Sequence, residues 1–82
     1  MRTGTINLYK NESIKFYNKD NIIIGHVSLQ YDYSMELQID WKTEDHPYYT
    51  ISAIFPVNFL IFCDYFKLYR KDGTEKTPED LW

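Results

Sequence analysis

Residues 34–41, SMELQIDW, alternate strictly between polar and apolar side chains. Successive side chains of a β-strand point to opposite faces of the sheet, so this period of two places all the apolar residues on one face. These residues are Met35, Leu37, Ile39 and Trp41. Such a segment is typical of an antiparallel sheet that has one face buried and the other in water. The sequence therefore predicts a fold built on half-buried antiparallel strands.

Four other segments have the β-branched and aromatic composition of strands and end at turn residues. They are residues 5–9 (TINLY), 13–18 (SIKFYN), 21–30 (NIIIGHVSLQ) and 48–55 (YYTISAIF). The short polar link 10–12 predicts a hairpin between the first two segments. The link 18–21 (NKDN) predicts a second turn, because Asn and Asp tolerate left-handed backbone geometry. Gly25, in the middle of the third segment, predicts a β-bulge or a bend.

Residues 58–70 (NFLIFCDYFKLYR) are compatible with two structures. A helix would start with Asn58 as its N-cap and stop before Gly73, with aromatic side chains along one stripe. A strand would have suitable residue types, and residues 71–74 (KDGT) would then form a hairpin turn. We favour the strand and keep the helix as the alternative.

A chain of 82 residues predicts a single domain, residues 1–82, with a thin core. We expect the all-β class, as a small antiparallel meander or barrel of five to six strands. The alternative is an α+β fold, with a five-stranded antiparallel sheet and one helix at residues 58–71. The predicted core consists of Ile14, Phe16, Ile23, Val27, Leu29, Met35, Leu37, Ile39, Ile51, Ala53, Phe55, Leu60, Phe62 and Phe66.

Residue types that carry catalysis or bind metals are sparse. Cys63 is the only cysteine and lies in an apolar run, which indicates a small buried hydrophobic residue rather than a nucleophile. His26 and His46 lie on separate segments, without the spacing of a zinc site. Asp64 interrupts the same apolar run, and we expect it to be ion-paired or outward-facing. We therefore expect no enzymatic activity, no metal and no cofactor.

Acidic residues are concentrated in the middle of the chain. Residues 32–64 contain six acids and one base, and the formal net charge of the whole chain is −3. On an unbroken strand, Asp32, Glu36 and Asp40 would share one face at intervals of about 13 Å, a spacing similar to that of alternate phosphates in a nucleic-acid strand. This acidic ridge predicts a surface that meets a basic groove on a larger protein. The predicted protein-binding residues are Tyr31, Asp32, Tyr33, Glu36, Asp40, Glu44, Asp45 and Trp82.

We expect the protein to be a non-enzymatic protein-binding module. Its preference for residues with A/T-rich codons indicates a low-GC bacterium or its phage, which suits a phage-encoded inhibitor of a host nucleic-acid-handling or defence protein. One alternative is a self-associating module that forms a homodimer through an exposed strand edge. The other is a small nucleic-acid-binding β-barrel that uses Tyr9, Tyr17, Lys10, Lys15 and Lys19. The isoelectric point of about 5.2 argues against nucleic acid as the partner.

Two features bear on localisation. The first ten residues lack the apolar stretch of a secretion signal, and the apolar run at residues 53–62 is too short to span a bilayer. We therefore expect a cytoplasmic protein without membrane contact, in a reducing compartment that suits a chain with a single cysteine.

Residues 77–82 (TPEDLW) have the signature of a helix start, with Thr77 as N-cap and Pro78 at the first helical position. One helical turn is not stable alone in water. We therefore expect Leu81 and Trp82 to be held by an apolar surface, either the open end of the sheet or a groove on a partner or a second copy.

Overall fold

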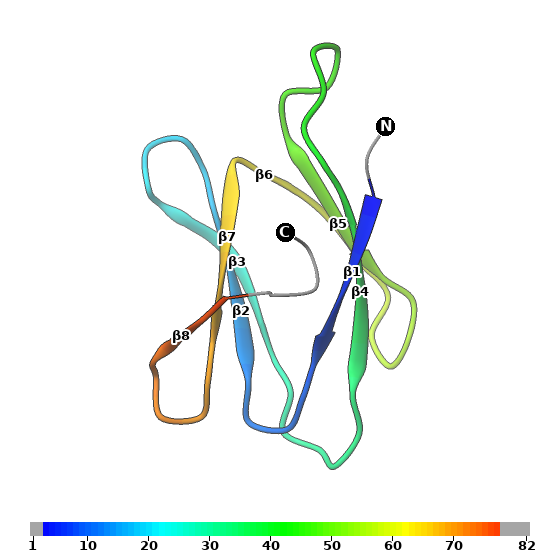
Figure 1. Cartoon of the computed structure of the whole chain (residues 1–82), viewed down its shortest axis with the longest axis vertical. Helices are drawn as coiled ribbons and strands as arrows, with labels where there is room; N and C mark the ends of the chain where they lie inside the picture. The colour runs from blue at the N-terminus through cyan, green and yellow to red at the C-terminus, as the bar shows by residue number, and fades with distance from the viewer. Residues whose placement is uncertain (1–2, 78–82) are drawn as a thin grey trace.

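The computed structural model describes residues 3–77, and it shows two antiparallel β-sheets packed face to face (Figure 1). The described residues contain no helix, so the all-β antiparallel class is confirmed. The strands are β1 (Thr3–Leu8), β2 (Ser13–Tyr17), β3 (Ile23–Ser28), β4 (Met35–Asp40), β5 (Tyr49–Ala53), β6 (Phe59–Cys63), β7 (Tyr65–Tyr69) and β8 (Glu75–Lys76). The predicted Thr77–Trp82 turn lies almost entirely outside the described residues.

The strand order in the first sheet is β1-β4-β5-β6, and in the second sheet it is β3-β2-β7-β8. The described chain therefore forms eight strands, and the predicted number of five to six is wrong. The arrangement is also two layers rather than one continuous meander, because the chain passes between the sheets after β1, after β3 and after β6 (Figure 1).

The predicted hairpin between the first two strands is wrong. β1 pairs with β4, whereas β2 pairs with β3 and β7, so the link 9–12 is a corner between the sheets. Asn11 adopts a φ of 66°, and its N–H donates to the carbonyl of Leu29 at 2.6 Å. A corner forms here because the apolar side chains of both strands are buried in one layer, which places β1 and β2 on opposite sides of it.

Residues 58–70 form strands, so the strand prediction is confirmed and the alternative helix is wrong. The chain changes sheet at Asp64, between β6 and β7, and the Asp64 N–H donates to the Tyr17 carbonyl at 2.9 Å. The predicted turn after β7 is also confirmed, since β7 pairs with β8. Gly73 has a φ of 87° there, and the Asp72 carboxylate accepts hydrogen bonds from the N–H and hydroxyl of Thr74 at 2.9 and 2.6 Å.

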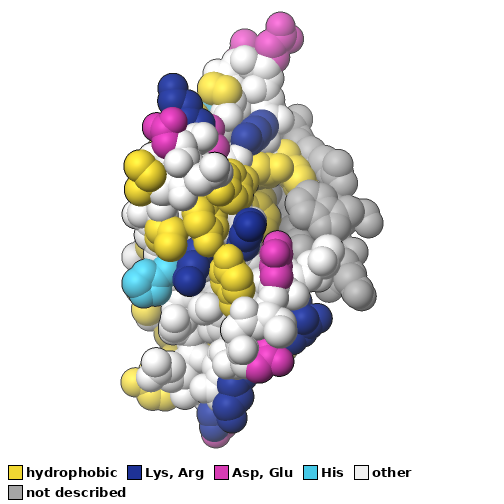
Figure 2. Space-filling model, turned by 90° about the vertical axis from the view of Figure 1, so that its left-hand side faces the viewer, with side chains coloured by type: hydrophobic (Ala, Val, Ile, Leu, Met, Phe, Trp, Pro, Cys, Tyr) yellow, Lys and Arg dark blue, Asp and Glu magenta, His cyan; other side chains and the backbone are white. Residues whose placement is uncertain are grey.

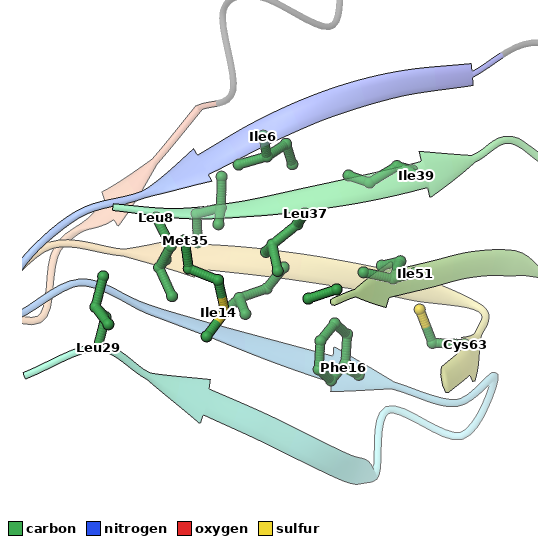
Figure 3. Packing of buried hydrophobic residues seen from close by; sticks show 12 residues of the cluster. Ile6, Leu8, Ile14, Phe16, Leu29, Met35, Leu37, Ile39, Ile51 and Cys63 are labelled. Carbon is green, nitrogen blue, oxygen red and sulfur yellow. The ribbon is translucent and has the colours of Figure 1, made fainter. Parts of the chain in front are cut away.

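The core lies between the two sheets (Figure 3). Its buried residues are Ile6, Leu8, Ile14, Phe16, Leu29, Met35, Leu37, Ile39, Ile51, Ala53, Cys63 and Leu68. Eight of the predicted core residues are among them, and Val27 and Phe66 pack against the cluster while partly exposed.

Four predicted core residues are exposed instead: Ile23, Phe55, Leu60 and Phe62. β6 turns Cys63 inward and Leu60 and Phe62 outward, the opposite parity to the one predicted. β5 ends at Ala53, so the alternation does not continue to Phe55. The predicted irregularity at Gly25 is confirmed, because the β2–β3 register shifts by one residue between Phe16 and Tyr17.

The alternation of buried and exposed side chains along β4 can be tested by truncating the neighbouring residues Leu37 and Gln38. Leu37 is fully buried and Gln38 is exposed, so Leu37→Ala should lower the free energy of unfolding by about 2–5 kcal/mol. Gln38→Ala should change it by less than about 0.5 kcal/mol. Urea unfolding followed by tryptophan fluorescence measures both values, and equal losses would contradict the inward orientation of Leu37.

Candidate protein-binding surface

The outer face of the first sheet is polar on β1, β4 and β5, and the charged side chains on its strands are all negative. Thr5, Gln38 and Ser52 lie side by side across β1, β4 and β5, so hydroxyl and amide groups cover its centre. The four strands of this sheet contain two ionisable carboxylates, Glu36 and Asp40, and no Lys or Arg. A charged ligand would therefore meet only carboxylates on these strands.

The acidic ridge predicted from the sequence is interrupted. Asp32 lies in the bend at residues 31–33, before β4 begins at Met35, so it does not continue the strand face of Glu36 and Asp40. Its carboxylate forms an exposed ion pair with Lys10, at 2.9 Å. The expectation of one unbroken row of carboxylates is wrong, because the chain bends where it enters the sheet.

The remaining predicted acids, Glu44 and Asp45, lie in the loop at residues 41–48 between β4 and β5. Two backbone hydrogen bonds between Thr43 and His46, at 2.9 and 3.2 Å, close this loop. It projects from the end of β4 that is opposite to the segment preceding β4 (Figure 1). The structure thus separates these acids from Tyr31 and Tyr33, and Trp82 lies outside the described residues.

An aromatic cluster lies where β4 begins. The rings of Tyr31 and Tyr33 are stacked, with centroids 5.6 Å apart and planes inclined by 5°. Tyr33 also contacts Phe55, at a centroid distance of 6.4 Å. Phe55 is 74% exposed and its neighbour Ile54 is 82% exposed, so these side chains face solvent. The predicted contact residue Tyr33 therefore meets Phe55, which the sequence assigned to the core.

A shallow depression of about 340 Å³ connects this cluster to the acidic strand face. Its lining residues are Asn7, Ser34, Glu36, Gln38, Ala53, Ile54 and Phe55. The Glu36 carboxylate accepts a hydrogen bond from the Gln38 amide at 2.9 Å, which orients it on this wall. The depression thus places one carboxylate beside an exposed aromatic ring.

Exposed apolar side chains continue from the cluster along β6, which is an edge strand of the first sheet. Leu60 is 61% exposed and Phe62 is 50% exposed, opposite Ser52 and Thr50 of β5. Together with the β5–β6 turn they form what we call the apolar rim: Tyr31, Tyr33, Ile54, Phe55, Val57, Leu60 and Phe62. A set of this size exceeds the scattered single apolar residues of an ordinary surface.

One sequence signal could have indicated the rim. Residues 53–62 (AIFPVNFLIF) contain a single polar residue, Asn58, so they lack the polar positions that a half-buried strand needs on its solvent side. One face of β6 packs against the core, and the surplus apolar residues necessarily lie outside it.

The groups considered for catalysis do not converge. Cys63 faces the core, whereas His26 is exposed on β3. Burial raises the pKa of the Cys63 thiol to about 11, with a smaller contribution from the negative charge of Asp64, so the thiol stays protonated at neutral pH. Residues 3–77 contain no group of three His, Cys, Asp or Glu side chains that could hold a metal ion.

Comparison with protein-family models, curated proteins and solved structures gives no match. Within the described part of the chain there is no helix long and apolar enough to cross a membrane. The surfaces of the sandwich are therefore the basis for inferring its function.

The raised pKa of Cys63 predicts a loss of stability at alkaline pH. The thiol ionises near 9.0 in the unfolded chain and near 11 in the folded one, so the unfolded state loses its proton first as the pH rises. Relative to Cys63→Ala, the native protein should lose about 1.4 kcal/mol of unfolding free energy per pH unit between pH 9 and 11. Urea titrations of both proteins measure the difference, and a constant difference would show that the thiol is not buried.

Proposed function

We propose that this protein is a protein-binding module that docks through the apolar rim and the adjacent carboxylates Glu36 and Asp40. The observation that carries the proposal is the exposure of seven large apolar side chains along one side of the first sheet. Groups of large exposed apolar side chains mark sites of protein association. Tyr31, Tyr33 and Phe55 also belong to the aromatic class that is enriched at the centres of protein interfaces.

The charge of the neighbouring strands specifies the chemistry of the partner. Glu36 lies in the wall of the depression, and both it and Asp40 lie on β4, in a sheet whose four strands contain no Lys or Arg. A partner that offers an apolar cleft flanked by Lys or Arg complements this surface. Surfaces rich in Lys and Arg are common in proteins that handle nucleic acids. A protein that occupied such a cleft would act as an inhibitor, and the amino-acid composition, which favours residues with A/T-rich codons, suits a phage-encoded, anti-defence inhibitor.

A second copy of the chain is the competing occupant. Among the described strands, β6 has no neighbour beyond it in the first sheet, and Leu60 and Phe62 lie on its solvent face. Two β6 edges could pair around a two-fold axis and cover these residues. Sedimentation equilibrium of the purified protein over a range of concentrations distinguishes the two occupants. We expect a monomer, and a dimer that Leu60→Ser dissociates would assign the rim to self-association instead.

Capture experiments with matched variants test the proposal. The immobilised native protein should retain a partner that Phe55→Ser loses, with affinity reduced by about tenfold or more, because aromatic residues at interface centres carry much of the binding energy. Ile23→Ser is the control, since Ile23 is 49% exposed on the second sheet and outside the rim. Equal retention by Phe55→Ser and the native protein would contradict the proposal.

The contribution of Glu36 and Asp40 to binding can be measured separately from that of the apolar rim. The double variant Glu36→Gln, Asp40→Asn removes both charges of the strand face with little change in shape. We expect slower association with the captured partner and a weaker dependence of the association rate on salt, measured by surface plasmon resonance. An unchanged salt dependence would show that the partner does not recognise these carboxylates.

A further inference from the structure

The outer face of the second sheet has a different composition from that of the first. Strands β2 and β7 place three pairs of residues side by side there: Ser13 with Tyr69, Lys15 with Lys67, and Tyr17 with Tyr65. Figure 2 shows this side of the molecule, where Lys and Arg side chains are set among side chains of the hydrophobic class, which includes Tyr. We call the five residues Lys15, Tyr17, Tyr65, Lys67 and Tyr69 the Tyr–Lys face.

Two like charges face each other at the centre of this face. Lys15 and Lys67 are register partners on adjacent strands, and neither forms an ion pair with a residue of the described chain. Like charges directly opposite in an antiparallel pair destabilise the sheet. The ammonium groups lie over aromatic rings, Lys15 at 5.0 Å from the Tyr69 centroid and Lys67 at 5.9 Å from that of Tyr17. Aromatic rings attract the two charges but do not neutralise them, so the face is suited to an anion.

The tyrosines of the face hold one another in place. The rings of Tyr17 and Tyr65 stack at a centroid distance of 4.7 Å with planes inclined by 5°. The hydroxyls of Tyr17 and Tyr69 share a hydrogen bond of 2.9 Å, which is the main cause of a raised pKa at Tyr17. The Tyr65 hydroxyl donates to the side chain of Asn21 at 2.6 Å. These partly exposed rings form an ordered aromatic platform on both sides of the lysine pair.

The positive charge continues beyond the end of the face. A shallow depression of about 390 Å³ adjoins Lys15 and Tyr69, and Arg70 and Lys71 also line it. The Arg70 guanidinium donates to the Glu75 carbonyl at 2.9 Å, which restricts its position. The one acid in the lining, Glu12, is ion-paired with Lys76 at 3.0 Å. Four cationic side chains therefore follow one path from Lys67 through Lys15 to the depression.

We propose that the Tyr–Lys face and this depression bind single-stranded nucleic acid. Lys15, Lys67, Arg70 and Lys71 would contact phosphates, and the tyrosine rings would pack against unstacked bases, as in other single-strand-binding sheets. A duplex would contact only the cationic side chains, because its paired bases are not free to pack against the tyrosine rings. The net charge of −3 does not oppose this binding, since the strands of the second sheet carry three bases and one acid. The site lies on the sheet that the protein-binding proposal does not use.

Fluorescence anisotropy with a labelled oligothymidine of about 12 nucleotides tests the proposal, since sites of this kind cover several nucleotides. We expect saturable binding that weakens with salt, with a slope of log affinity against log salt of about −0.7 for each phosphate contacted. The double variant Lys15→Gln, Lys67→Gln should make this slope less steep, by about 1.4, because two phosphate contacts are lost. Tyr65→Ala should reduce affinity by about tenfold. Phe55→Ser, which alters only the apolar rim, is the control and should bind as the native protein does.

Three outcomes would overturn the proposal. They are no binding at low salt, equal binding of a duplex of the same length, and full binding by the double lysine variant. Equal duplex binding would show general affinity for polyanions, without a role for the rings. Phe55→Ser alters the apolar rim and not the Tyr–Lys face, so the two proposals are tested independently. Failure of the nucleic-acid proposal would leave the protein-binding proposal intact, and the reverse also holds.

Lys67→Glu provides a second readout that a misfolded variant could not reproduce. It converts the like-charge pair with Lys15 into an opposite-charge pair, so the melting temperature should rise by about 1–5 °C. The same variant should lose most of its affinity for the oligonucleotide. A rise in melting temperature with unchanged binding would show that the lysine pair has no part in a nucleic-acid site.

Discussion

The hydrophobic layer between the two sheets is the contact on which the rest of the structure depends. Its twelve buried residues come from seven strands or their flanking segments, and no described polar or charged side chain is buried with them. Each of these seven strands therefore contributes one apolar face to the layer and leaves its other face in water. Residues 3–77 contain no further helix or strand to cover those outer faces.

This constraint leaves each sheet with one outer face, and the two outer faces differ in chemistry. The strands of the first sheet carry two carboxylates and border the apolar rim, whereas the second sheet carries the Tyr–Lys face. Packed sheets lie about 10 Å apart, so charges on opposite faces are separated by more than the Debye length of about 8 Å at physiological salt. Each face can therefore have its own partner, although the net charge of the chain is negative.

Turn residues with left-handed or side-chain-capped backbones help to position these faces. Asn11 and Asn21 adopt φ values of 66° and 63°, and the Asn18 side chain accepts hydrogen bonds from the N–H groups of Asp20 and Ile22. The turn at Asn18–Ile22 also supplies Asn21 to the Tyr65 hydroxyl, so one local structure both reverses the chain and orders the aromatic platform. At Gly25 an added Cβ would lie 3.0 Å from a methyl group of Ile61, which explains why the smallest residue is found where β3 approaches β6.

The sequence by itself determined the all-β class, the approximate positions of the strands, the turn residues and most of the core, because side-chain alternation and turn chemistry act between neighbours in the chain. It indicated Tyr31 and Tyr33 as surface aromatics for the same reason. Only the tertiary structure decided which strands pair, which side chains of β6 face inward and that Tyr33 contacts Phe55. It alone placed Lys15 opposite Lys67. These features depend on contacts between segments far apart in the chain, and such contacts leave no local pattern in the sequence.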